Sequence, residues 1–81
     1  MEPPLVYVDF GNADSVGRIR LITEGTRDDV EKQKLQFHDG MKIRVYDAEL
    51  VTDATVAYSS DEHIWVAKID WQKIKPGFRN E

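Results

Sequence analysis

The sequence predicts a small, mainly β protein: an antiparallel barrel or rolled sheet of five to six strands, with one short helix at about residues 27–33. Three observations lead to this prediction. The chain has 81 residues, which suits one domain. Several short runs alternate apolar and polar residues, with turn-forming residues between them. One segment alone carries helix-capping signals. We expect a single β domain over residues 1–71 and a polar C-terminal tail over residues 72–81.

Two strands are predicted before the helix. In residues 5–10, Val6, Val8 and Phe10 fall on one face, as expected for a strand with a buried side. Residues 17–23 alternate two arginines with aliphatic residues. That alternation is typical of an antiparallel strand with one solvated face.

The helix prediction for residues 27–33 depends on capping and charge order. Thr26 is a favourable N-cap residue, and Asp29 follows it in the first turn. Lys32 lies near the end, where the helix dipole favours a cation. Val30 is the one strongly apolar residue within the segment, so we expect the helix to cover the sheet and to be held by tertiary contacts.

Four further strands are predicted after the helix, over residues 35–37, 41–47, 50–59 and 64–71. The alternation is clearest in residues 41–47. Residues 38–40 form a turn that ends in glycine. The strand over residues 50–59 is expected to be interrupted near its third and fourth residues.

The stretch Leu-Gln-Phe-His-Asp-Gly-Met-Lys-Ile-Arg-Val-Tyr-Asp, which begins at Leu35, resembles the turn-plus-strand entry of SH3-like barrels. In those barrels a glycine introduces an alternating strand, and a hairpin and a closing strand follow. The resemblance covers roughly residues 35–70. It implies an SH3-like architecture and carries over no functional residues.

Composition excludes several classes of protein. There is no cysteine, which excludes disulfides, thiol catalysis and cysteine–zinc sites. No apolar run approaches the roughly 18 residues of a membrane span, and no basic stretch precedes an apolar one near the N-terminus. We therefore expect a cytoplasmic, bacterial-type domain.

No catalytic, cofactor-binding or metal-binding residue is predicted. His38 and His63 adjoin predicted turns, and their spacing places no two ligands on one face. Asp9 and Asp70 lie within apolar strand runs and are the candidates for acid–base catalysis. Strict alternation places both carboxylates on the solvent side. The sequence also lacks a Gly-rich phosphate loop and a nucleophile elbow, so we expect a protein that is not an enzyme.

The main functional prediction is a protein-interaction module that binds a partner or forms a homodimer. The chain has two Trp, three Tyr and three Phe, more aromatic surface than so small a core is expected to bury. Residues 45–67 contain acids and no Lys or Arg, so acidic and basic regions alternate along the chain. Aromatic side chains are enriched in interface hot spots. The candidate contact residues are Tyr46, Tyr58, Trp65, Trp71 and Phe78.

The alternative is a nucleic-acid-associated barrel. Cations project outward from two predicted strands, and an aromatic ring beside them is able to stack on a base. The net charge of −4 opposes this function, and such cations also commonly coat the solvent face of a sheet. The alternative requires the two strands to be neighbours. Its candidate residues are Arg18, Arg20, Lys42, Arg44 and Tyr46.

Overall fold

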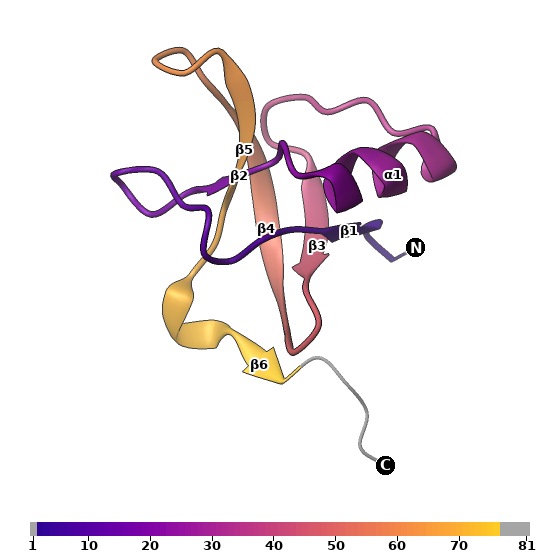
Figure 1. Cartoon of the computed structure of the whole chain (residues 1–81), viewed down its shortest axis with the longest axis vertical. Coiled ribbons are helices and arrows are strands. Elements are labelled where there is room, and N and C mark those ends of the chain that lie inside the picture. Colours follow the sequence, from indigo (N-terminus) through magenta and orange to yellow (C-terminus); the bar gives the residue numbers. More distant parts are fainter. Residues whose placement is uncertain (1, 77–81) are drawn as a thin grey trace.

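A curled sheet, which forms an open half-barrel, makes up most of the computed structural model, and one helix lies at its edge (Figure 1). The structure describes residues 2–76. The strands follow the order β1-β3-β4-β5-β2, and β6 pairs with β4. The prediction of a mainly β rolled sheet of five to six strands with one helix is confirmed. The elements are β1 (Leu5–Tyr7), β2 (Ile19–Arg20), α1 (Glu24–Gln33), β3 (Lys42–Tyr46), β4 (Leu50–Ser59), β5 (Ile64–Lys68), the 3₁₀ helix η1 (Trp71–Lys73) and β6 (Lys75–Pro76).

The sheet is not wholly antiparallel. Strands β3, β4 and β5 form an antiparallel meander, and β2 joins β5 in the same sense. Strand β1 pairs with β3 in parallel, so that pair departs from the expected antiparallel arrangement. The reason is the connection: a parallel pair needs a crossover, and the chain between β1 and β3 is long enough to include α1. Residues 8–18 connect the two edge strands, β1 and β2, across the open side of the curled sheet (Figure 1).

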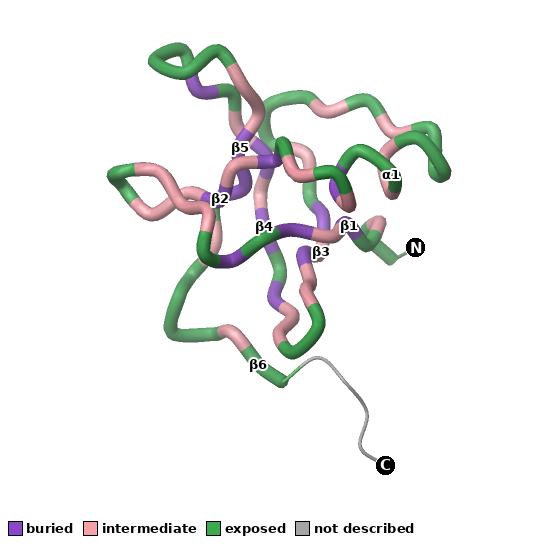
Figure 2. Tube along the Cα trace, in the orientation of Figure 1, coloured by how far each residue is buried: buried purple, intermediate pink, exposed green. Residues whose placement is uncertain are grey.

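The core lies on the inner face of the curl. Buried and more exposed residues alternate along β3 and along most of β4 (Figure 2). The inward faces predicted for residues 5–10 and 17–23 are confirmed, since Val6, Val8, Phe10, Ile19 and Leu21 are buried. In the last strand, alternation predicted that Trp65, Ala67, Ile69 and Trp71 share one face and that Val66 lies on the other. That prediction is wrong in part, because Val66 is buried as well as Ala67 and Trp71 is exposed. The buried hydrophobic cluster consists of Val6, Val8, Phe10, Ile19, Leu21, Ile43, Val45, Ala54, Val56 and Ala67.

Helix α1 starts earlier than the predicted residue 27, and its N-cap is Thr23 instead of Thr26. The hydroxyl of Thr23 accepts a hydrogen bond from the backbone N–H of Thr26 at 3.3 Å. Thr26 itself is buried inside the helix, and its hydroxyl donates to the backbone carbonyl of Tyr7. Both threonines are suitable caps, and this tertiary bond decides which of them lies within the helix.

Residues 35–37 do not form the predicted strand. Leu35 and Phe37 pack against the core, but β3 already has β1 on one side and β4 on the other. Strand β3, the next strand along the chain, therefore has no free side with which the segment could pair. The expected interruption of β4 is also absent, because residues 51–55 pair with β3 without a break.

The end of the chain differs from the predicted strand over residues 64–71. Strand β5 ends at Lys68, and the Asp70 carboxylate then accepts the N–H of Gln72 at 3.0 Å, which starts η1. The chain returns to the sheet as β6, within the segment assigned to the tail. Phe78, a predicted contact residue, lies outside the described residues.

Candidate functional site

Strand β4 lacks a neighbour along part of one edge. On that side Lys68 of β5 pairs with Thr55, and Lys75 of β6 pairs with Val51. Residues 69–74 leave the sheet between these two pairs. Within residues 2–76, residues 52–54 of β4 therefore have β3 on one side and no strand on the other.

The backbone groups of Asp53 point into this gap. The carbonyl of Leu50 accepts from Asp47, and Val56 exchanges hydrogen bonds with Gly40 and Met41, all on the β3 side. In an antiparallel ladder, alternate residues bond to opposite neighbours. The N–H and the carbonyl of Asp53 consequently face away from β3, toward the interrupted edge.

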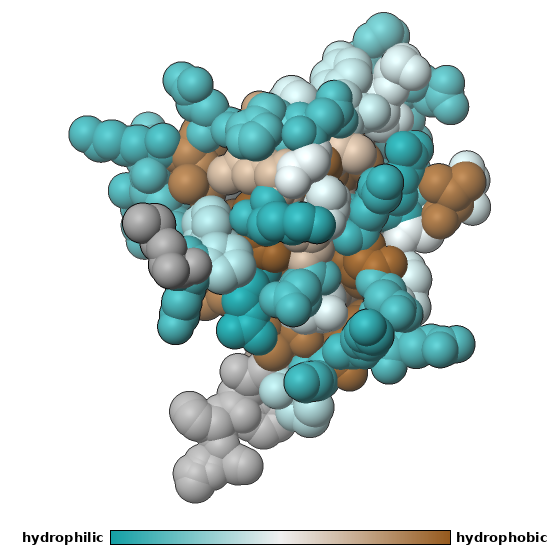
Figure 3. Space-filling view, turned by 180° about the vertical axis from the view of Figure 1, so that it is seen from behind, coloured by the Kyte–Doolittle hydropathy of each residue, from teal (hydrophilic) through white to brown (hydrophobic). Residues whose placement is uncertain are grey.

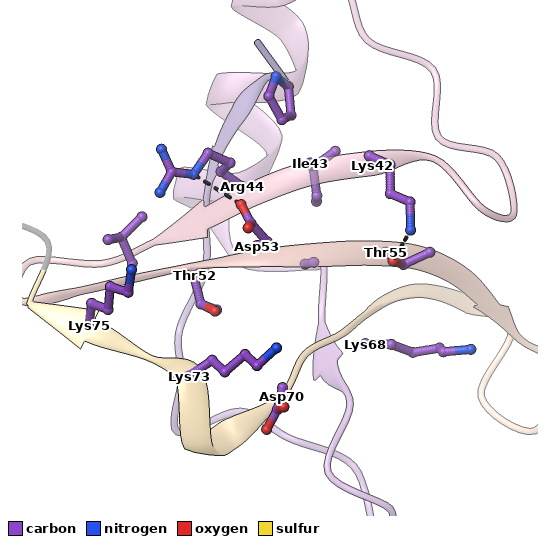
Figure 4. A pocket seen from close by; sticks show the side chains of 13 residues that line it. Lys42, Ile43, Arg44, Thr52, Asp53, Thr55, Lys68, Asp70, Lys73 and Lys75 are labelled. Atoms are coloured by element: carbon purple, nitrogen blue, oxygen red, sulfur yellow. Dashed lines mark hydrogen bonds and ion pairs between the residues drawn. The ribbon is translucent and has the colours of Figure 1, made fainter.

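A groove of about 570 Å³ covers the gap and the adjoining outer surface of β3 and β4 (Figure 4). Its volume falls within the range of ligand-binding sites, roughly 300–1,000 Å³. Cations outnumber carboxylates in its lining although the whole chain has a net charge of −4. We call it the basic groove; its charged lining residues are Lys42, Arg44, Lys68, Lys73, Lys75, Asp53 and Asp70.

The carboxylates of the basic groove are already engaged. Asp53 Oδ1 lies 3.2 Å from Arg44 Nε, and Asp70 caps η1. Lys42 donates to the hydroxyl of Thr55 at 3.1 Å. Within residues 2–76, the other three cations of the groove are the ammonium groups of Lys68, Lys73 and Lys75.

In the described part of the chain, Lys68, Lys73 and Lys75 have no ion-pair partner. Each of the three is exposed. Figure 4 shows the side chains of Thr52 and Lys73 within the gap between β4 and the segment that carries η1. The groove thus offers uncompensated positive charge beside open backbone groups.

The structure separates the predicted nucleic-acid residues. Lys42 and Arg44 line the basic groove, but β4 and β5 lie between β3 and β2, so Arg20 is on another part of the sheet. Arg18 Nε is 2.8 Å from Asp14, and Arg20 forms two hydrogen bonds with Glu62, of 2.8 and 2.9 Å. The two N-terminal arginines and the two β3 cations do not form one patch.

These ion pairs lower the pKa values of the two carboxylates, as expected for acids with a structural role. The hydrogen bonds from the Arg20 guanidinium lower the pKa of Glu62. Burial acts to raise the pKa of Asp14, but the N–H groups of Arg18 and Val16, together with the Arg18 guanidinium, outweigh it and lower that pKa. Both acids therefore stay ionised near neutral pH, where Asp14 pairs with Arg18 just before β2 and Glu62 pairs with Arg20 of β2.

Tyr46 is also engaged elsewhere. Its hydroxyl donates to Asp29 of α1 at 2.8 Å, and the N–H of Tyr7 donates to the same oxygen at 2.9 Å. Burial, reinforced by the hydrogen bond to Asp29, raises the pKa of Tyr46 to about 12. The two tyrosine rings pack edge to face at 5.5 Å. Tyr46 fastens the helix to the sheet and does not line the groove.

Among the described residues, the other predicted contact residues Tyr58, Trp65 and Trp71 do not line the groove. Tyr58 is exposed and packs edge to face on the half-buried Trp65, with 5.1 Å between ring centroids, at the opposite end of β4. Trp71 donates from its indole N–H to the carbonyl of Gly17 at 2.8 Å and packs on Phe10. The face seen in Figure 3 is mostly hydrophilic, with hydrophobic atoms scattered between polar side chains.

The candidate acid–base residues both support local turns. Asp9 is exposed, and its Oδ1 accepts the N–H of Gly11 at 2.9 Å, while Asp70 caps η1. In residues 2–76 no three His, Asp or Glu side chains are grouped as metal ligands. No helix among the same residues has the length and hydrophobicity needed to cross a membrane.

Comparison with family models, curated proteins and solved structures found no match to this chain. The site therefore has to be interpreted from its own residues. Sequence reasoning did not select Lys68, Lys73 and Lys75 as site residues. The sequence feature that could have indicated them is the run of cations near the C-terminus. That run lies beside Lys42 and Arg44 only because β6 returns to pair with β4.

Proposed function

We propose that this protein is a non-enzymatic interaction module that binds an acidic segment of a partner protein in the basic groove. One observation carries the proposal: within residues 2–76, lysines without an ion-pair partner lie around a stretch of β4 that has no strand on one side. A peptide main chain needs hydrogen-bond partners at a sheet edge, and acidic side chains need cations. The groove supplies both.

Two features favour a protein segment over a nucleic acid. No aromatic residue is among those lining the groove in the described part of the chain, so bases have no stacking platform there. The net charge of −4 opposes the approach of a polyanion, whereas a short acidic peptide senses mainly the local lysines.

The test is fluorescence anisotropy with a labelled peptide of about ten residues that alternates Glu and Val, spanning more than the open edge. We expect binding that weakens as salt rises from about 50 to about 300 mM, since exposed charges are screened. A peptide with Gln in place of every Glu should not bind.

A matched pair of protein variants locates the binding. Exposed charge pairs contribute about 0.2–1 kcal/mol each, so replacing Lys68 and Lys73 together with Gln should weaken binding roughly two- to thirtyfold. Replacing Lys32 and Lys34 of the helix end with Gln removes the same charge and should leave the affinity unchanged. Absence of binding at low salt refutes the proposal, and tighter binding of a labelled oligo-deoxythymidine would replace it with nucleic-acid binding.

A further inference from the structure

The open edge of β4 is bounded at both ends. Strand β5 ends opposite Thr55 and β6 begins opposite Val51, so both lie in line with any strand that would pair with residues 52–54. At about 3.3 Å per residue, the free stretch is about 10 Å long. A chain that continued straight along β4 would meet Lys68 at one end or Lys75 at the other.

A bound chain that pairs with Asp53 must therefore end within the gap or turn out of it. The two kinds of chain end carry opposite charges. Lys68, Lys73 and Lys75 have no ion-pair partner in the described residues, and Lys73 extends into the gap itself (Figure 4). These ammonium groups attract a carboxylate and repel an α-ammonium group. Thr52, a buried residue, also lines the gap (Figure 4).

We propose, on the basis of the function proposed above, that the groove captures the C-terminus of a partner chain. The last residues pair with the backbone of Asp53, and Lys73 with its neighbouring lysines binds the terminal carboxylate. Recognition of a chain terminus in this way explains how a site only about three residues long gains specificity.

The geometry also selects the side chain next to the terminus. Directly opposed residues of two strands point to the same face, so the ligand residue opposite Asp53 points outward. Lys68 and Lys75 are paired with Thr55 and Val51, which are on the same outward face of β4. An Asp or Glu at that ligand position faces Asp53, whose carboxylate is paired with Arg44, and lies between Lys68 and Lys75 along the strand direction. We expect the two lysines to outweigh Asp53, so that an acidic C-terminus is preferred over an apolar one.

The experiment compares two labelled peptides of about eight residues that end in Val-Glu-Val. One has a free C-terminal carboxylate. The other is amidated and carries one extra Glu near its N-terminus, so that both have the same net charge. We expect the free acid to bind at least about fivefold more tightly, and Lys73→Gln to bring the two affinities close together. Lys32→Gln should preserve the difference.

Main-chain pairing is measured separately on the unaltered protein. Saturation with the free-acid peptide should slow hydrogen exchange of the Asp53 amide, and the amide of Asp61 in the β4–β5 turn should not change. Equal affinities for the two peptides, or no protection of Asp53, overturn the C-terminal mode and leave the proposed function standing. Failure of every acidic peptide to bind overturns both.

Discussion

The Asp29 carboxylate shows how a single residue holds two elements together. One of its oxygens accepts from the N–H of Tyr7 and from the hydroxyl of Tyr46. Gly25 lies one helical turn earlier, where an added Cβ would be 2.5 Å from the Tyr7 ring. Close approach of α1 to β1 thus requires glycine at this position, and Asp29 then receives both bonds.

Removing the hydroxyl of Tyr46 tests this contact. We expect Tyr46→Phe to lower the free energy of unfolding by about 1–2 kcal/mol near neutral pH, since a hydrogen bond to a charged group is lost. The pKa of Tyr46 is raised from 10.0 to about 12 on folding, so the bond's stabilisation is complete below pH 10 and declines as pH rises toward 12. Urea unfolding at neutral pH and at several values above pH 10 measures this.

The difference in free energy of unfolding between the unaltered protein and Tyr46→Phe should therefore shrink as the pH rises from 10 toward 12. Tyr58→Phe is the matched control, because the hydroxyl of that exposed tyrosine has no hydrogen-bond partner among the described residues. A difference that stays constant up to pH 12 would show that Tyr46 does not act through its proton.

At the scale of elements, the end of α1 carries backbone strain. Lys34 is the C-cap residue, with φ of 56° and ψ of 44°, the left-handed conformation that favours glycine. Its N–H bonds to the carbonyls of Val30 and Glu31, which closes the helix and lets the chain turn toward Leu35. The sequence places a lysine where the backbone favours glycine.

Lys34→Gly should therefore stabilise the protein by about 0.5–1 kcal/mol, because it removes the side chain that the left-handed conformation disfavours. The matched control is Glu31→Gly, an exposed position within the same helix, which should destabilise by about 1 kcal/mol. Thermal and urea unfolding of both variants measure whether each substitution raises or lowers the free energy of unfolding. Destabilisation by both substitutions would contradict this account of the helix end.

On the scale of the whole molecule, charge is distributed along β4. The basic groove lies over residues 51–55, and the β4–β5 turn at the other end carries Asp61 and Glu62. A surface of each sign on one molecule permits contact between copies, which is the homodimer version of the interaction prediction.

If copies associate through these surfaces, sedimentation at low salt should show a species larger than the monomer, and salt should dissociate it. Replacing Lys68 and Lys73 with Gln should weaken the association, and replacing Lys32 and Lys34 should not. A monomer across the micromolar range at every salt concentration would exclude the homodimer and would leave a different partner protein as the ligand.

The local pattern of apolar and polar residues was sufficient to predict most of the strands. Alternation predicted the buried faces of β1, β2 and β3, and the glycine of the turn before β3 has the expected positive φ at Gly40. The SH3-like architecture stays a prediction. The site was predicted less well: of its cations, the sequence analysis selected Lys42 and Arg44 and combined them with Arg18 and Arg20, which lie elsewhere.

Local sequence pattern was enough to predict the class of the fold, because side-chain periodicity and turn residues act over a few positions of the chain. Tertiary structure alone decided three further features: the parallel pairing of β1, the absence of a strand at residues 35–37 and the assembly of the basic groove. Each depends on which edges of the sheet are already occupied. The groove exists because β5 and β6 both pair with β4 while residues 69–74 do not, and that long-range pairing has no local signal in the sequence.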